Sequence, residues 1–153
     1  MIGTTIADPH HIESEAETID GLGFLKIATV MAKEKTLTRT TAVHVESGEE
    51  VRGYEIHHGV TDAEGVEPIL KLSDGRFVGA RSPDGLMWGA YVHGIFDSDG
   101  FRRWFLDRLR VRRGLAPIGR ISAIYDPEPA LERLAEVVRR SIDVDRIYGL
   151  MGL

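Results

Sequence analysis

Apolar and polar residues follow two different patterns along the chain. The first part contains short stretches rich in β-branched residues, bounded by glycine, aspartate and serine, which is typical of strands and turns. The predicted strands are 24–31, 36–45, 51–57, 68–72, 76–80 and 86–93. Asp74 and Gly75 form a turn signal that predicts a hairpin between two of them. We expect residues 1–7 to be the end of a helix and 13–20 a short helix.

The last part of the chain has helical periodicity and predicts three amphipathic helices. The first spans 98–113, begins at the good N-cap types Asp97 and Ser98, and stops at Gly114. The second begins after Asp126 and Pro127. The third spans 143–150. The apolar faces of the first two helices consist of Phe101, Trp104, Phe105 and Leu109, and of Leu131, Leu134, Ala135, Val138 and Ile142.

This order, strands first and helices afterwards, favours an α+β fold or the second half of an α/β domain. The chain has 153 residues, which predicts one domain over 1–153. No internal repeat, low-complexity tract or domain linker is evident. The run 86–93 is almost continuously apolar, so we expect that strand to be buried on both faces.

Composition narrows the classes of function. The net charge of −5 predicts no general attraction to nucleic acid or to anionic membranes. The six arginines between 102 and 113 are therefore interpreted as a solvated helix face. The N-terminus shows no signal peptide, so a cytoplasmic location is expected. There is no cysteine, which excludes disulfides and thiolate metal sites in this chain.

Among the polar side chains, His93 is the best candidate for chemistry. It ends a predicted strand just before a helix, where open α/β sheets place their ligands and reactive groups. The alternative is a histidine that merely packs at a strand end. Glu55, His57 and His93 could form a metal triad, but their spacing gives little support. His44 is expected on a strand surface, and nucleotide-binding loops and serine-hydrolase elbows are absent from the sequence.

Two motifs together resemble the glutamine amidotransferase domain of cobyric acid synthase. They are Gly53-Tyr54-Glu55-Ile56-His57-His58-Gly59-Val60-Thr61 and Gly89-Ala90-Tyr91-Val92-His93-Gly94-Ile95-Phe96-Asp97. The segments at 6–9, 21–23, 131–135 and 142–148 are similar to the same domain in order. The resemblance implies an α/β fold: the C-terminal part of a class I glutamine amidotransferase-like (flavodoxin-like) domain, with a mixed sheet, flanking helices and the N-terminal strands missing.

The resemblance also implies a reaction. The family hydrolyses glutamine with a cysteine–histidine pair, and an ATP- and Mg-dependent synthetase domain uses the ammonia to amidate corrinoid carboxylates in cobalamin biosynthesis. His93 matches the catalytic histidine. Glu55 and His57 lie in a family motif and are expected near the cleft as substrate-binding residues. The wider superfamily often has a carboxylate two residues after the histidine, where this chain has Ile95.

The chain departs from the family in having no cysteine, so we expect the isolated chain to be inactive and to contain no cofactor. Glutamine and a corrinoid are the expected ligands of the parent enzyme, and a homo-oligomer is expected because a partial domain exposes apolar surface. Tyr91, two residues before His93, is predicted to face the same side of the strand. The alternatives are a non-catalytic interaction module with the same fold and the related domain of cobyrinic acid a,c-diamide synthase.

Overall fold

The computed structural model describes residues 1–152, which form two compact units, one from Met1 to Ser122 and one from Ala123 onward. Each unit is described by itself. The strands are β1 (Thr5–Ala7), β2 (Thr18–Asp20), β3 (Ala28–His44), β4 (Glu50–Asp62), β5 (Leu70–Leu72), β6 (Phe77–Val78), β7 (Ala80–Arg81), β8 (Trp88–Gly89) and β9 (Val92–His93). The helices are the 3₁₀ turn η1 (Ile95–Asp97), α1 (Asp99–Arg112), α2 (Glu128–Ser141) and α3 (Val144–Met151).

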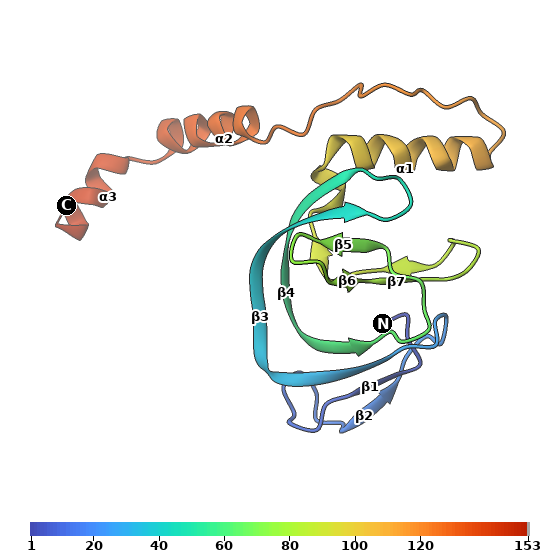
Figure 1. The fold of residues 1–153 in the computed structure, drawn as a ribbon. Helices are drawn as coiled ribbons and strands as arrows, with labels where there is room; N and C mark the ends of the chain where they lie inside the picture. The colour runs from blue at the N-terminus through green and yellow to red at the C-terminus, as the bar shows by residue number, and fades with distance from the viewer. Residues whose placement is uncertain (153) are drawn as a thin grey trace. The chain divides into compact units, whose positions relative to one another are not determined.

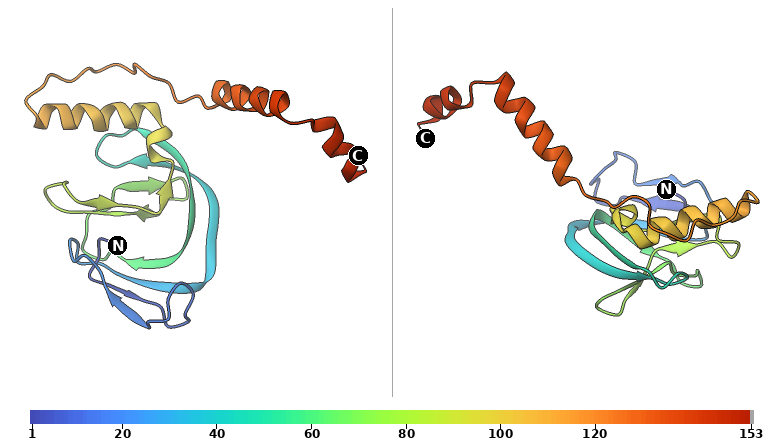
Figure 2. Two further views of the ribbon diagram at one scale, coloured as in Figure 1. Left: turned by 180° about the vertical axis from the view of Figure 1, so that it is seen from behind. Right: turned by 90° about the horizontal axis from the view of Figure 1, so that it is seen from above.

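The long, curved hairpin of β3 and β4 dominates the first unit (Figure 1). The two strands pair antiparallel from Val43 opposite Glu50, beside the turn, to Ala28 opposite Asp62 at the far end. Their register shifts between Met31 and Thr36, which marks a β-bulge. The views from behind and from above also show the bend of this hairpin (Figure 2).

Strands β1, β2, β5, β6 and β9 extend this hairpin into a mixed sheet. Its order is β2-β1-β3-β4-β9, and β5 also pairs with β3 beyond the end of β1. Only the pairing of β1 with β3 is parallel among the described strands of this sheet; the other pairings are antiparallel. The predicted mixed sheet is confirmed, and so is the hairpin around Asp74 and Gly75, which joins β5 to β6.

The main core of the first unit lies where α1 meets the turn end of the hairpin. Phe101 from α1 is 1% exposed and packs with Val51 of β4 and Leu70 of β5. Trp88 and Trp104 cover this cluster from its edge. A second, smaller cluster is built on Leu25, Ile27 and Ala80.

Helix α1 has the predicted bounds within one residue at each end, and Gly114, the predicted stop, follows it in a left-handed conformation (φ 74°). Ser98 is the N-cap residue, but its hydroxyl makes no capping bond. It accepts instead from the backbone N–H of Arg52 (2.9 Å) and thereby joins the start of the helix to β4.

The structure differs from the predicted elements in four places. Residues 1–7 contain strand β1 instead of a helical end, and 13–20 contain β2 instead of a helix. The carboxylate of Asp8 accepts hydrogen bonds from the backbone N–H groups of Ile12, Glu13 and Ser14. These bonds hold a turn after β1, and the chain returns as β2, antiparallel to β1. The predicted strands 24–31 and 36–45 belong largely to one strand, β3, which runs on through the bulge.

The fourth difference concerns 86–93. This run divides into β8, which pairs with β7 in a separate two-stranded sheet, and β9, which pairs with β4. The chain changes partner between them, so the predicted single strand is wrong. The predicted burial on both faces is wrong too, since Leu86 is 48% exposed and His93 is exposed.

In the second unit, α2 and α3 follow the predicted helices. The carboxylate of Asp143 accepts from the N–H of Arg146 (2.9 Å) and caps the start of α3, and Gly152 ends it. The apolar residues of α2 are not buried; Leu134, for example, is 59% exposed. No helix in the described part of the chain is long and apolar enough to cross a membrane. The single domain expected over 1–153 stays a prediction.

Candidate functional site

His93 lies at the exposed edge of the sheet, in β9. It is directly opposite Tyr54 of β4 in the antiparallel register. The two rings are stacked, with centroids 5.0 Å apart and planes inclined by 10°. Within the described residues, the imidazole has no hydrogen-bond partner. His93 therefore presents both ring nitrogens and is held through one face of its ring.

Two glycines make this position possible. A Cβ on Gly53 would lie 2.0 Å from the carbonyl oxygen of His93, so only glycine lets β9 approach β4 this closely. Gly94 has φ 78°, a left-handed conformation that other residues rarely adopt, and it turns the chain from β9 into η1. The backbone of His93 is thus fixed from both sides.

Glu55 and His57 face the other side of β4. The register pairs Glu55 with Val92, the neighbour of His93, and side chains alternate between the faces of a strand. The carboxylate Oε2 of Glu55 lies 3.1 Å from Nε2 of His57, and the side chains are 7% and 16% exposed. The other carboxylate oxygen of Glu55 accepts from the hydroxyl of Thr40 (3.3 Å).

Tyr91 continues this polar network. Its ring stacks on His57 with centroids 4.0 Å apart, and its hydroxyl is hydrogen-bonded to Thr61 (2.6 Å). Thr61 is in turn hydrogen-bonded to Thr29 of β3 (2.7 Å). Gly59 lies beneath the ring, where a Cβ would be 2.7 Å from the Tyr91 hydroxyl. The polar side chains of this face satisfy one another.

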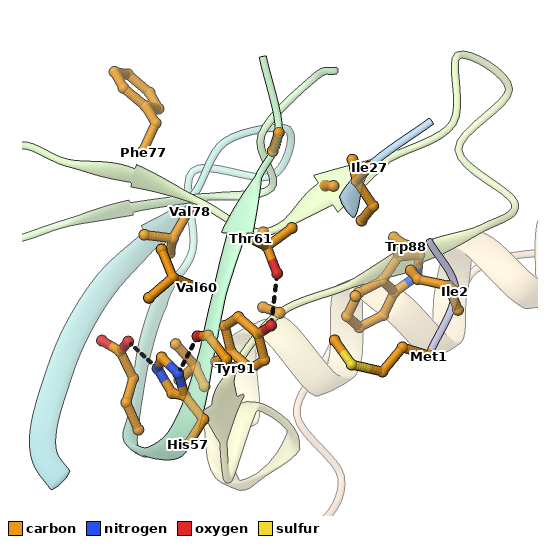
Figure 3. A pocket seen from close by; sticks show the side chains of 18 of the residues that line it. Met1, Ile2, Ile27, His57, Val60, Thr61, Phe77, Val78, Trp88 and Tyr91 are labelled. Atoms are coloured by element: carbon orange, nitrogen blue, oxygen red, sulfur yellow. Dashed lines mark hydrogen bonds and ion pairs between the residues drawn. The ribbon is translucent and has the colours of Figure 1, made fainter. Parts of the chain in front are cut away.

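This network forms one wall of a cavity of about 540 Å³, shown in Figure 3. The remaining walls are mainly apolar, from Ile2, Ile27, Val60, Val78 and Trp88 among others. The volume and the mixture of apolar walls with a few polar groups are typical of small-molecule sites. Neither Tyr54 nor His93 lines this cavity.

The structure therefore separates residues that the sequence grouped. Glu55 and His57 come together as predicted, but His93 lies on the opposite face of the sheet. The three side chains therefore do not form the metal triad considered from the sequence, and the described residues contain no cluster of three or more such ligands. Tyr91 does not share the face of His93, because regular alternation in β9 covers only Val92 and His93.

Tyr54 is the contact that sequence reasoning missed. The signal lay in the motif itself, since Tyr54 is the residue before Glu55 and must face the other way in a strand. Its pairing with His93 depends on the register between β4 and β9, which the sequence alone does not specify.

His44 is also placed differently from its prediction. It is 6% exposed instead of lying on the strand surface, and it contacts the rings of Phe101 and Trp104. Burial lowers the pKa of His44 to about 4, and the nearby charges of Arg81 and Arg108 act in the same direction. Its Nδ1 accepts from the backbone N–H of Ser47 (3.1 Å), so the neutral ring fits its surroundings.

His44 lines a second cavity of about 280 Å³ between β7, β8 and α1. Glu46 bridges Arg81 and Arg108 beside it. Two further arginines of α1, Arg102 and Arg103, form ion pairs with Asp99 and Asp107 of the same helix. The basic residues of α1 thus contribute to contacts within the chain.

Comparison with known proteins gives a consistent result. The chain is 45% identical to a cobyric acid synthase of Nitratidesulfovibrio vulgaris, in a match covering 100% of this chain and 34% of that protein. It is 42% identical to the adenosylcobalamin biosynthesis bifunctional protein CobDQ of Leptospira interrogans (100% and 18%). It is 38% identical to a cobyric acid synthase of Clostridium botulinum (100% and 33%).

The chain thus spans about a third or less of the length of these relatives. Residues 1–101, from the first residue of the chain to the first turn of α1, match the sequence profile of the CobB/CobQ-like glutamine amidotransferase domain. This range includes both motifs and the pair of Tyr54 and His93. The chain belongs to the CobB/CobQ-like glutamine amidotransferase domain family.

Proposed function

We propose that the chain is the histidine-bearing part of the glutaminase domain of a cobyric acid synthase. In this proposal, glutamine is hydrolysed at His93, and a synthetase domain outside these residues uses the ammonia to amidate corrinoid carboxylates. That domain would bind ATP and Mg²⁺, and the enzyme would act in cobalamin biosynthesis in the cytoplasm. The exposed imidazole of His93, with both nitrogens open, supports this role most directly.

His93 would act as a general base and then as a general acid. An unpaired ring nitrogen accepts the proton of a cysteine thiol, and the resulting imidazolium protonates the leaving ammonia. The 153 residues contain no cysteine, so the thiol would come from outside them. We therefore propose that the isolated chain does not release glutamate from glutamine.

Glu55 and His57 are less suited to contact the same glutamine as His93. They lie on the other face of β4, and their polar atoms are bonded to each other, to Thr40 and to the carbonyl of Gly59. This arrangement supports a structural role for the pair. Their assignment as substrate-binding residues stays a prediction.

A chimera tests the proposed function. The segment of the Nitratidesulfovibrio vulgaris cobyric acid synthase that this chain matches is replaced by this chain. The proposal requires the rest of that protein to supply the thiol. Corrinoid amidation is measured with glutamine and, separately, with ammonium chloride, which bypasses glutamine hydrolysis. We expect both activities in the chimera, and His93→Ala should remove only the glutamine-dependent one.

The control is His10→Ala, a substitution in an exposed turn, which should leave both activities intact. Full glutamine-dependent activity in the His93→Ala chimera would contradict the proposal. The absence of cysteine favours one second candidate, a non-catalytic interaction module with the same fold. That candidate predicts a chimera that uses ammonia but never glutamine.

A further inference from the structure

We propose that Tyr54 is the positioning residue of His93 and orients its imidazole by stacking. The inference rests on the proposed role of His93 in glutamine hydrolysis. It assigns to the phenol ring of Tyr54 the task that a hydrogen-bonded partner often performs for catalytic histidines.

The geometry of the pair is the first support. Tyr54 and His93 are direct cross-strand neighbours, so their side chains leave the sheet on the same face. The inclination of 10° places the rings nearly parallel at a centroid distance of 5.0 Å, within the range of favourable aromatic pairs. Tyr54 is 47% exposed, so it covers one face of the imidazole and leaves the rim open.

The second support is that no hydrogen bond orients the imidazole. Within the described residues no polar side chain is hydrogen-bonded to it. Ile95, two residues further on, has no polar group and is 8% exposed in the main core. Gly53 and Gly94 fix the backbone of His93, but they leave its side-chain torsions free. In this proposal, stacking on the ring of Tyr54 restricts those torsions.

Stacking has a chemical advantage at this position. A carboxylate bonded to one ring nitrogen would orient the imidazole but would occupy that nitrogen. A ring face restrains the plane and leaves both nitrogens available for proton transfer. Within the described part of the chain the hydroxyl of Tyr54 makes no hydrogen bond, so only its ring is needed and phenylalanine should replace tyrosine.

The first measurement uses the 153-residue chain in solution. The ring-proton resonances of His93 are assigned by NMR in the wild type and in Tyr54→Phe, Tyr54→Leu and Tyr148→Leu. The stacked ring should shift the His93 protons upfield in the wild type and in Tyr54→Phe, and Tyr54→Leu should remove this shift. Tyr148, 51% exposed in α3, provides the matched control.

His57 provides an internal reference, because its ring stacks on Tyr91 on the other face of β4. Its resonances should stay in place in Tyr54→Leu if the sheet is intact. An unshifted His93 in the wild type would overturn the proposal. So would a Tyr54→Leu variant in which the His93 resonances do not move.

The second measurement uses the chimera described above. Tyr54→Leu should lower kcat for glutamine hydrolysis on the order of 10- to 100-fold, as for a misplaced catalytic group. KM for glutamine and the ammonia-dependent activity should stay unchanged. Tyr54→Phe should have the kcat of the chimera with the wild-type residue. Unchanged kcat in Tyr54→Leu would overturn the positioning role while His93→Ala still tests the proposed function separately.

Discussion

Oε2 of Glu55 lies 3.1 Å from Nε2 of His57, in a pair that is almost closed to solvent. The Nδ1 of His57 donates to the carbonyl of Gly59 (2.8 Å), because a carbonyl oxygen can only accept. A hydrogen bond between Glu55 and His57 therefore needs one proton between Oε2 and Nε2.

This pair makes a prediction for stability. Glu55→Leu removes the partner of a buried ring nitrogen and should lower the free energy of unfolding by roughly 3–5 kcal/mol. Glu55→Gln should cost much less, because its amide can donate to the neutral imidazole. Urea unfolding of the two variants checks the difference, and Glu50→Gln, in an exposed ion pair with Arg52, is the control. Equal losses for Leu and Gln would contradict the shared proton.

The close approach of β4 and β9 makes a second prediction. Gly53→Ala places a Cβ 2.0 Å from the carbonyl oxygen of His93 and 2.8 Å from Val92, so the strands must separate. We expect a loss of roughly 1–3 kcal/mol, typical of overpacking, with displaced His93 resonances. Gly149→Ala is the control, since its added Cβ meets no atom within 4 Å. A Gly53→Ala variant as stable as the wild type would show that β9 is not held against β4.

The buried ring of His44 predicts that the free energy of unfolding depends on pH. Its pKa is about 4 in the folded chain, against 6.5 for the unperturbed side chain, so folding favours the neutral form. The contribution of His44 to the free energy of unfolding should be fully present above pH 6.5. It should decrease as the pH falls from about 6.5 towards 4, because in this range the unfolded state binds a proton that the folded state does not. Urea midpoints across this range measure the decrease.

The matched variant is His44→Asn, whose side-chain oxygen can still accept from the N–H of Ser47. It should lower stability at all pH values but flatten the dependence between pH 6.5 and 4. His10→Asn, in an exposed turn, should keep the wild-type slope. A His44→Asn slope as steep as that of the wild type would assign the effect to another group.

The edge of the sheet predicts self-association. Ile19 of the edge strand β2 is 46% exposed, and Leu22 and Phe24 beside it are 65% and 54% exposed. Unpaired strand edges with apolar neighbours favour contact between copies. Sedimentation velocity should show a coefficient that rises with concentration, and Leu22→Ser with Phe24→Ser should reduce the rise. A monomer at every concentration would refute the prediction.

The helices could be predicted from the sequence because their signals are local. The apolar spacing of Phe101, Trp104 and Phe105, the cap residues and Gly114 all lie within the helix they define. The full length of strand β3 was harder to predict, because the charged run Lys33-Glu34-Lys35 interrupts its apolar pattern. The strand continues there because β4 pairs with it on both sides of a bulge, a contact between distant segments.

The site could be predicted only in part. The motifs predict His93, Glu55 and His57 as site residues; the family is confirmed, and the roles of the three residues stay predictions. The sequence did not show that the three residues lie on two faces, because that depends on which residue of β4 is opposite His93. It also did not show that the ring of Tyr91 stacks on His57. The alternation of side chains between the two faces holds only within β9, which begins after Tyr91.

Adjacent residues of β4 serve two different environments, with Tyr54 beside His93 and Glu55 facing the cavity. If the residues of β4 before this point kept their pairing, inserting one residue just before Tyr54 would move the phenol to the register position of Glu55, on the cavity face. Deleting one residue there would instead place the carboxylate of Glu55 opposite His93. Substitutions can be accommodated one at a time in this stretch, whereas a change in its length must come in steps of two residues.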